Sequence, residues 1–235
     1  MSDSNEGDAW RYVTATSRPA QGAWAEKRRL AAAIRTVVEH LITADIDEAD
    51  LARTAAGLER FTATLEALPR RSKREGYAET STAGDVDALF DCSPLIGLSN
   101  PLAPPIRLWT EGNRVFGAAE FGVRYEGPPG CLHGGFVAAA FDEVLGFAQS
   151  LTRNPGMTGT LTVRYKAPTP LMRELRFEAW IDHVEGRKIF AKATLHAGTL
   201  LTAEAEGIFI SIDAKRFAEL LEPREEPDRP PRRGA

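Results

Sequence analysis

The chain has 235 residues, of which 43% are hydrophobic and 26% charged, with a net charge of −4 at pH 7. These values suit a globular protein with one sizeable core, and they exclude a general attraction to nucleic acid or to anionic membranes. No apolar run is long enough to span a bilayer, and the polar residues after Met1 do not resemble a secretory signal. Two distant cysteines, Cys92 and Cys131, indicate neither a disulfide framework nor a zinc site. We therefore expect a cytoplasmic protein.

The first predicted structure is a helical hairpin over residues 23–68, preceded by a disordered N-terminus over 1–22. The second helix begins at Asp47, a good N-cap residue, and ends before Pro69. Each helix carries one apolar face, so the hairpin must cover either the main domain or a partner subunit. The two faces are Leu30, Ile34, Val37, Val38, Leu41 and Ile42, and Leu51, Ala55, Leu58, Phe61, Leu65 and Leu68.

A charged linker follows over residues 69–87. We interpret it as a solvated connector, and contact with the phosphates of a nucleotide-bearing substrate is the alternative. Its basic residues are Arg70, Arg71, Lys73 and Arg74. The next segment, 88–105, is rich in proline, which favours turns and extended backbone over helix.

From Ile106 onward the apolar residues recur with a period of two, which indicates strands. We predict strands at 106–110 and 113–125, a helix from Gly134 to Ser150, and further strands at 158–166, 174–184, 187–196 and 200–212. The helix is apolar on most sides, so it should be buried. The domain at 88–213 should therefore be α+β, with a curved antiparallel sheet wrapped around a long helix. In chain order it reads as two strands, the helix and a meander of four. A short helix and a disordered tail should occupy 214–235.

The start of the predicted central helix combines three features that carry chemistry. A turn rich in Gly and Pro brings His133, Gly134 and Gly135 to the helix N-terminus, which presents unpaired N–H groups and a partial positive charge. Asp142 follows in the third turn, and a carboxylate in an apolar helix is costly unless it has a partner or a function. Together they predict an oxyanion site, a polarising imidazole and a general base or nucleophile in one local unit.

The block HGG-x6-D at the start of an apolar helix is followed by a strand that reads TGTLTVRYKAPTPL. Over about residues 90–212 this pattern resembles the hotdog-fold acyl-CoA thioesterases of the PaaI-like group. The resemblance implies a hotdog fold, here with an N-terminal helical extension, and hydrolysis of an acyl-CoA thioester to a free acid and coenzyme A without metal or cofactor. It also implies a homodimer or a dimer of dimers, with the active site shared between subunits.

The same resemblance implies roles for individual residues. Asp142 would activate water or attack the thioester, and the residues do not decide which. The N–H of Gly134 would hold the thioester oxygen, and His133 would orient or polarise the carbonyl. Thr158 would approach the nucleophile from the neighbouring subunit. Some relatives carry an Asn six residues before the histidine, where this chain has Gly127.

Four further residues are candidate substrate contacts: Gly135, Glu143, Arg164 and Lys166. Glu143 lies about 100° around the helix from its neighbour Asp142, so the two carboxylates cannot point the same way. Glu143 could instead contact a subunit or solvent. Arg164 and Lys166 could hold the phosphates of coenzyme A, although basic residues on strands are usually solvated.

Three other functions remain open at this point. The domain could bind acyl-CoA or sense a ligand without turnover. It could hydrate an enoyl-CoA, although hotdog hydratases pair an Asp with a following His and no His follows Asp142 on this helix. The hairpin at 23–68 could dock a partner protein. The acyl group, and the choice between coenzyme A and acyl-carrier protein as thiol, are not encoded in any recognisable pattern.

Overall fold

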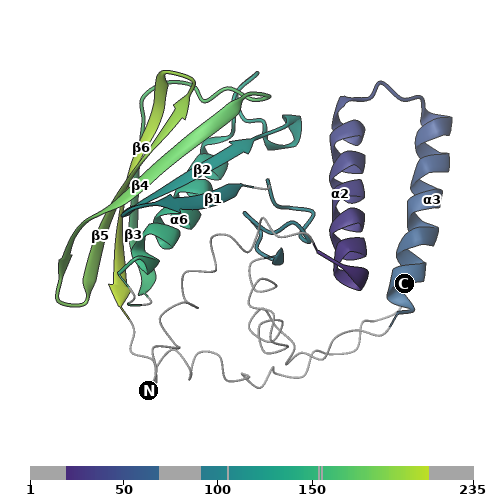
Figure 1. The fold of residues 1–235 in the computed structure, drawn as a ribbon. Helices are drawn as coiled ribbons and strands as arrows, with labels where there is room; N and C mark the ends of the chain where they lie inside the picture. Colours follow the sequence, from purple (N-terminus) through teal and green to yellow (C-terminus); the bar gives the residue numbers. More distant parts are fainter. Residues whose placement is uncertain (1–19, 69–90, 105, 153, 155, 212–235) are drawn as a thin grey trace, which may run out of the picture.

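The computed structural model describes residues 20–68, 91–104, 106–152, 154 and 156–211 (Figure 1). Expectations for the first 19 residues, for the linker at 69–87 and for the segment from 214 onward lie outside the described residues. In chain order the elements are the helices α2 (Gly22–Thr43) and α3 (Glu48–Glu66), the strands β1 (Arg107–Glu111) and β2 (Arg114–Glu120), the 3-10 turn η1 (Val123–Tyr125), the helix α6 (Gly134–Ser150), and the strands β3 (Gly156–Tyr165), β4 (Glu174–Glu185), β5 (Lys188–Ala197) and β6 (Leu200–Ser211).

The six strands form one antiparallel sheet in the order β1-β2-β4-β5-β6-β3. Tight turns join three of the strand pairs, and glycine occupies the left-handed position of each, with φ of 61° at Gly112, 55° at Gly186 and 61° at Gly198. The predicted meander of four strands is wrong in one respect, because β3 pairs with β6 and not with β4. Residues 166–173 carry the chain from β3, at one edge of the sheet, to β4. A period of two reveals strands but does not encode their order.

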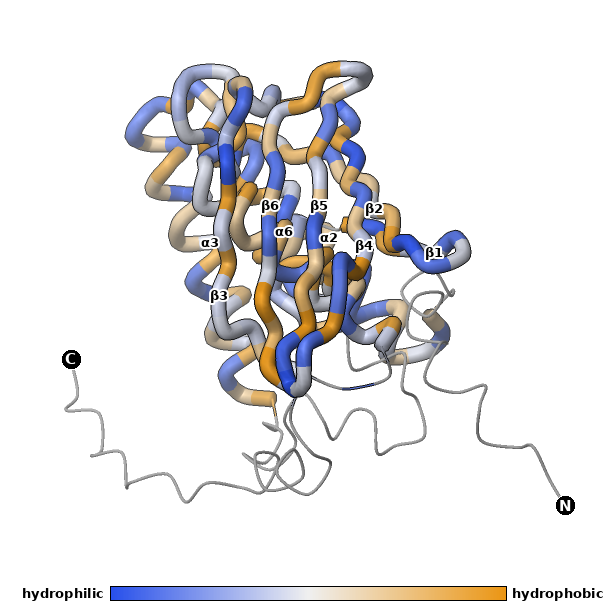
Figure 2. Tube along the Cα trace, turned by 90° about the vertical axis from the view of Figure 1, so that its left-hand side faces the viewer, coloured by the Kyte–Doolittle hydropathy of each residue, from blue (hydrophilic) through white to orange (hydrophobic). Residues whose placement is uncertain are grey.

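Helix α6 packs against one face of this sheet and forms the centre of the core. Side chains from β4, including Leu175 and Phe177, point toward it and are at most 1% exposed, and Phe177 meets Phe141 of α6 edge-on with ring centroids 5.8 Å apart. Figure 2 shows apolar and polar positions alternating along β5 and β6, as a sheet with one covered face requires. The expected hotdog fold, a long helix wrapped by an antiparallel sheet, is confirmed.

The strand predicted at 113–125 ends earlier, at Glu120, because helix α2 contacts the residues that follow and changes the direction of the backbone. Glu39 of α2 accepts the N–H of Val123 at 2.8 Å and forms an ion pair with Arg124 at 3.0 Å. A Cβ at Gly122 would lie 2.5 Å from the Glu39 carboxylate. This long-range contact turns the backbone into η1, and nothing in the local periodicity signals it.

The predicted N-terminal helical extension is confirmed as two helices, which run side by side in Figure 1. Asp47 caps α3, as expected, by accepting the N–H of Asp50 at 2.8 Å. Helix α2 lies between the sheet domain and α3. The extension is therefore attached to the domain through α2.

Candidate active site

The turn before α6 is shaped by backbone contacts that leave no room for a side chain at Gly127. The Gly127 N–H donates to the Cys131 carbonyl at 2.9 Å, and the His133 N–H donates to the Tyr125 carbonyl at 2.9 Å. A Cβ on Gly127 would lie 2.7 Å from the Cα of His133. The position at which some relatives carry Asn is thus restricted to glycine in this chain, and a carbonyl bound here depends on other donors.

His133 is the N-cap of α6, and this role fixes the position of its proton. Its Nδ1 accepts the N–H of Gly135 at 3.0 Å. The neutral imidazole therefore carries its proton on Nε2, and because the side chain is exposed, that N–H can reach a substrate carbonyl. The cap also occupies the Gly135 N–H, so a substrate contact of Gly135 does not use this donor.

The N–H of Gly134, the first residue of α6, has no hydrogen-bond partner among the described residues. Tyr165, at the end of β3, donates its hydroxyl to the Gly134 carbonyl at 2.8 Å, and its ring borders the position where a Cβ of Gly134 would stand. Our sequence reasoning missed Tyr165. The signal was present, because alternation along β3 places it on the same face as Val163, which packs against the core.

Asp142 and Thr158 meet within one chain. The Thr158 hydroxyl donates to Asp142 Oδ1 at 2.8 Å, whereas Oδ2 has no partner among the described residues. The contact depends on a β-bulge at Gly159, where the register of β3 against β6 shifts and Thr158 turns toward α6. The expectation that Thr158 comes from the neighbouring subunit is therefore wrong, because the chain's own strand supplies it.

Gly134 and Asp142 are too far apart to act on the same carbonyl in one chain. They lie eight residues apart on α6, which corresponds to about 12 Å along a helix. An oxyanion donor must lie about 3 Å from the oxygen that it stabilises. The expectation of a complete site in one local unit is therefore wrong for the single chain.

Glu143 differs from its neighbour Asp142 in its electrostatic environment. Burial, and secondarily the charge of Asp142, raise the pKa of Glu143 from 4.5 to about 7. Its carboxylate has no hydrogen bond or ion pair among the described residues. The folded chain therefore binds a proton at Glu143 over a pH range in which the unfolded chain has released it.

This difference predicts a pH-dependent gain in stability for Glu143→Gln. The folded state holds the extra proton between pH 4.5 and about 7, so the free energy of unfolding of the wild type falls as pH rises through this window. The neutral amide removes that loss, and we expect the melting temperature of the variant to exceed that of the wild type by roughly 5 °C at pH 8.

Below pH 4.5 the two melting curves should coincide. Differential scanning calorimetry at pH 4.5, 6 and 8 measures the effect. The control is Glu59→Gln, at an exposed position of α3, which should give no pH-dependent difference from the wild type. An equal shift of Glu143→Gln at every pH would contradict the assigned proton.

Arg164 of β3 and Lys166, the residue after the end of β3, form ion pairs with β6. Arg164 pairs with Glu206 at 2.7 Å, and Lys166 pairs with Glu204 at 2.9 Å. Lys166 also lines a cavity of ≈ 320 Å³ that includes Tyr165 and Val137 and so borders the start of α6. The structure therefore brings Lys166 to the edge of the candidate site, whereas Arg164 is not among the residues that line this cavity.

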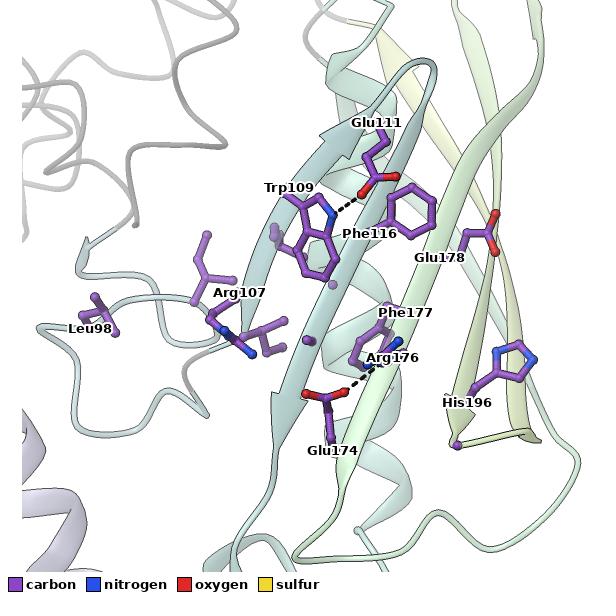
Figure 3. A pocket seen from close by; sticks show the side chains of 16 residues that line it. Leu98, Arg107, Trp109, Glu111, Phe116, Glu174, Arg176, Phe177, Glu178 and His196 are labelled. Atoms are coloured by element: carbon purple, nitrogen blue, oxygen red, sulfur yellow. Dashed lines mark hydrogen bonds and ion pairs between the residues drawn. The ribbon is translucent and has the colours of Figure 1, made fainter. Parts of the chain in front are cut away.

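A more spacious cavity, of ≈ 830 Å³, lies over β1, β2 and β4 and includes none of the predicted site residues (Figure 3). Two pairs of its polar side chains bond to each other. The Trp109 Nε1–H donates to Glu111 at 2.9 Å, and Arg176 pairs with Glu174 at 2.8 Å. Volume alone favours this cavity, but the free N–H of Gly134 and the oriented carboxylate of Asp142 both belong to α6, which favours this helix as the place of the reaction.

Two absences concern only the part of the chain that the structure describes. Within it, no cluster of three or more His, Cys, Asp or Glu side chains could hold a metal ion. None of the helices described is both long and apolar enough to cross a lipid bilayer.

Comparison with known proteins identifies relatives of the sheet domain. The family model described as "Thioesterase superfamily" matches residues 129–204. Acyl-coenzyme A thioesterase THEM4 of Xenopus laevis is 36% identical over 93 residues, which is 39% of this chain and 42% of the relative. THEM4 of Bos taurus is 35% identical over 97 residues, 40% of each chain. This chain thus matches only about two fifths of the length of these curated relatives.

A crystal structure extends the likeness beyond the sheet domain. The protein RHA08564, described as a thioesterase superfamily protein, is 32% identical to this chain with a TM-score of 0.70. The match covers 82% of this chain and 97% of that protein. This share exceeds what residues 91–211 alone could supply, so the likeness also includes part of the N-terminal region.

Proposed function

We propose that this chain, which belongs to the thioesterase superfamily, hydrolyses an acyl-CoA thioester to a free acid and coenzyme A. The observation that carries the proposal is the Asp142 carboxylate, which Thr158 holds at 2.8 Å through one oxygen while the other has no partner among the described residues. The similarity to acyl-coenzyme A thioesterases supports acyl-CoA as the substrate class.

Asp142 can act in either of two ways. As a general base it takes a proton from water while the water oxygen bonds to the thioester carbon. As a nucleophile its own oxygen bonds to that carbon, and water then hydrolyses the resulting mixed anhydride. In both routes the carbonyl π electrons move to oxygen, and collapse of the tetrahedral intermediate breaks the C–S bond. The departing thiolate then takes up a proton.

The developing oxyanion needs a donor that Asp142's own chain cannot supply, because its Gly134 is about 12 Å away along the helix. Strand β3 suggests where the donor comes from. It is ten residues long, lies at an edge of the sheet and is largely exposed, and such an edge favours pairing with another strand. We propose a homodimer in which two β3 strands pair antiparallel.

In this dimer, the two α6 helices would run side by side in opposite directions. Each active site would then take Asp142 and Thr158 from one chain and His133 and Gly134 from the other. Two such dimers could pair further into a tetramer without changing the site. The resemblance implied that Thr158 comes from the neighbouring subunit. In the proposed dimer, His133 and Gly134 come from that subunit instead.

The cavity that Tyr165 and Lys166 line is the proposed entry for the substrate. Its apolar members, including Leu132 and Val137, suit the methylene and amide chain that precedes the thiol of coenzyme A. Lys166 would then stand near the phosphates. Its ion pair with Glu204 is exposed, so exchange for a phosphate costs little.

The test is thiol release from a panel of short-, medium- and long-chain and aryl-acetyl CoA thioesters at pH 7.5. We expect saturable turnover of at least one thioester by the wild type, with a blank subtracted for Cys92 and Cys131. Saturable binding of acyl-CoA without any release of thiol would overturn the hydrolase and favour a binding or sensing protein. Formation of hydroxyacyl-CoA from an enoyl-CoA would favour a hydratase.

A further inference from the structure

The two N-terminal helices expose most of their apolar side chains. No residue of α3 is buried, and α2 buries only Ala31. In proteins, most of the stability of a helix comes from the packing of its apolar face. Ten large apolar residues of this extension are 37–59% exposed: Leu30, Val37, Val38, Leu41 and Ile42, together with Leu51, Leu58, Phe61, Leu65 and Leu68. We call these ten residues the hairpin stripe.

The chain's own sheet domain does not cover the hairpin stripe, because α2 uses a different, polar face to dock. Arg28 pairs with the buried Asp91 at 2.8 Å, and Arg35 donates to the Asn100 carbonyl at 2.8 Å. Glu39 completes this face with its ion pair to Arg124 at 3.0 Å. Helix α3 lies beyond α2, away from the sheet (Figure 1). The sequence allowed the hairpin to pack on either the main domain or a partner subunit. The main domain of the same chain is therefore excluded for these ten residues.

The spacing of the stripe suits packing between helices. Leu58 and Leu65 of α3 are seven residues apart, as are Phe61 of α3 and Leu68, which follows the end of the helix. Apolar residues that alternate at intervals of three and four form the seam of antiparallel helix bundles. Two hairpins of this kind, brought face to face, would form a four-helix bundle.

We propose that the hairpin stripe binds the hairpin of a second copy of this chain. Charge favours this occupant. Helix α2 has four Lys or Arg against two Glu, a net charge of +2, whereas α3 has two Arg against four Asp or Glu, a net charge of −2. Arg28, Arg35 and Glu39 face the sheet domain, so the rest of α2 keeps two basic residues and one Glu, a net charge of +1, and still attracts the α3 helix of another copy.

The location of α3 favours the same second copy that pairs through β3. Figure 2 places α3 on the side of the molecule where β3 forms the sheet edge. A copy that pairs along this edge lies on the side toward which α3 extends. The hairpin contact between these two copies rests on the proposed β3 dimer. In that dimer, the hairpins and the β3 strands form two parts of the same interface.

The experiment compares the full-length wild type with Leu58→Glu/Leu65→Glu by sedimentation equilibrium over a wide range of concentrations. Both substitutions lie on exposed positions of α3, and Glu is a good helix former, so the chain should fold. We expect the dissociation constant of the assembly to rise at least about a hundredfold, because four large apolar side chains per dimer leave the interface.

The matched control is Ala52→Glu/Ala63→Glu, which adds the same charge to exposed positions on the opposite side of α3. It should dissociate at the wild-type concentration. Amide hydrogen exchange gives a second readout, since α3 should be protected in concentrated wild type and unprotected in Leu58→Glu/Leu65→Glu. Equal dissociation constants for the two variants, or rapid exchange of α3 in the concentrated wild type, would overturn the proposal.

Turnover per chain separates this proposal from the proposed function. If the hairpins join the two copies that share an active site, Leu58→Glu/Leu65→Glu loses turnover on dilution and regains it at high concentration. A wild type that assembles through its hairpins but releases no thiol would contradict the proposed hydrolysis and would still support the hairpin interface.

Discussion

Asp142→Asn lowers kcat for thioester hydrolysis about 10³-fold and leaves the fold intact. The amide has nearly the shape of the carboxylate, and its oxygen can still accept the Thr158 hydroxyl, which lies 2.8 Å from Oδ1. It can neither take a proton from water nor attack the carbonyl carbon. The substitution also removes a partly buried charge, so the melting temperature should not fall. Thiol release and thermal unfolding monitored by circular dichroism measure both effects.

Thr158→Val provides the comparison, because it removes the hydroxyl that orients the carboxylate and keeps the carboxylate itself. We expect kcat to fall about tenfold, since the base survives but loses one fixed hydrogen bond. If Asp142→Asn retained more than a tenth of wild-type turnover, Asp142 would be neither base nor nucleophile, and Glu143 would become the candidate.

Gly134→Pro should reduce kcat by about 10²–10³-fold by removing one N–H group. Proline is tolerated at the first position of a helix, where its missing N–H interrupts no helical hydrogen bond. The preceding residue, His133, already has φ −60° and ψ 130°, a conformation that suits a residue before proline. The substitution thus removes the proposed oxyanion donor with little disturbance of α6. Steady-state kinetics should show the loss in kcat.

Gly134→Ala is the matched control, because it adds a Cβ in the same place and keeps the N–H. The new Cβ would lie 3.3 Å from the Tyr165 hydroxyl, so the exposed ring has to shift slightly. We expect this variant to keep most of its turnover. Equal losses for proline and alanine would assign the effect to crowding at Tyr165 and would contradict the oxyanion role.

Mixing the two inactive chains tests whether the site is shared. A mixed dimer of Asp142→Asn and Gly134→Pro has one site in which both the carboxylate and the N–H are intact. At equal concentrations, after exchange of subunits, about a quarter of wild-type activity should return. No recovery, with mixed dimers shown to form, would mean that both groups act within one chain.

The sequence was sufficient to predict the elements of the sheet domain because local patterns encode them. The helix from Gly134 to Ser150 is apolar on most sides and starts at a glycine pair, and both of its ends were predicted correctly. Alternating apolar residues located the strands, and Glu-Gly and Ala-Gly pairs located the tight turns. The position of Asp142 on the helix, eight residues after Gly134, followed directly from the same pattern.

Contacts between distant residues account for what the sequence did not reveal. The partner of Asp142 is the chain's own Thr158, and this depends on a single extra residue in β3. The early end of β2 depends on Glu39, which lies 84 residues before Val123. Neither contact leaves a periodic trace. Tyr165 was visible in the alternation of β3 but was overlooked beside its two basic neighbours.

The bulge at Gly159 makes the exact length of β3 matter more than the identity of many of its side chains. With one residue fewer, the strand would return to regular alternation, and either Thr158 or the set of Leu161, Val163 and Tyr165 would turn to the outer face. An inserted residue would have the same effect. Evolution can therefore exchange side chains along β3 more readily than it can lengthen or shorten the strand. Insertions and deletions are better tolerated at the exposed tips of the tight turns, such as Gly186 and Gly198, where no site geometry depends on the residue count.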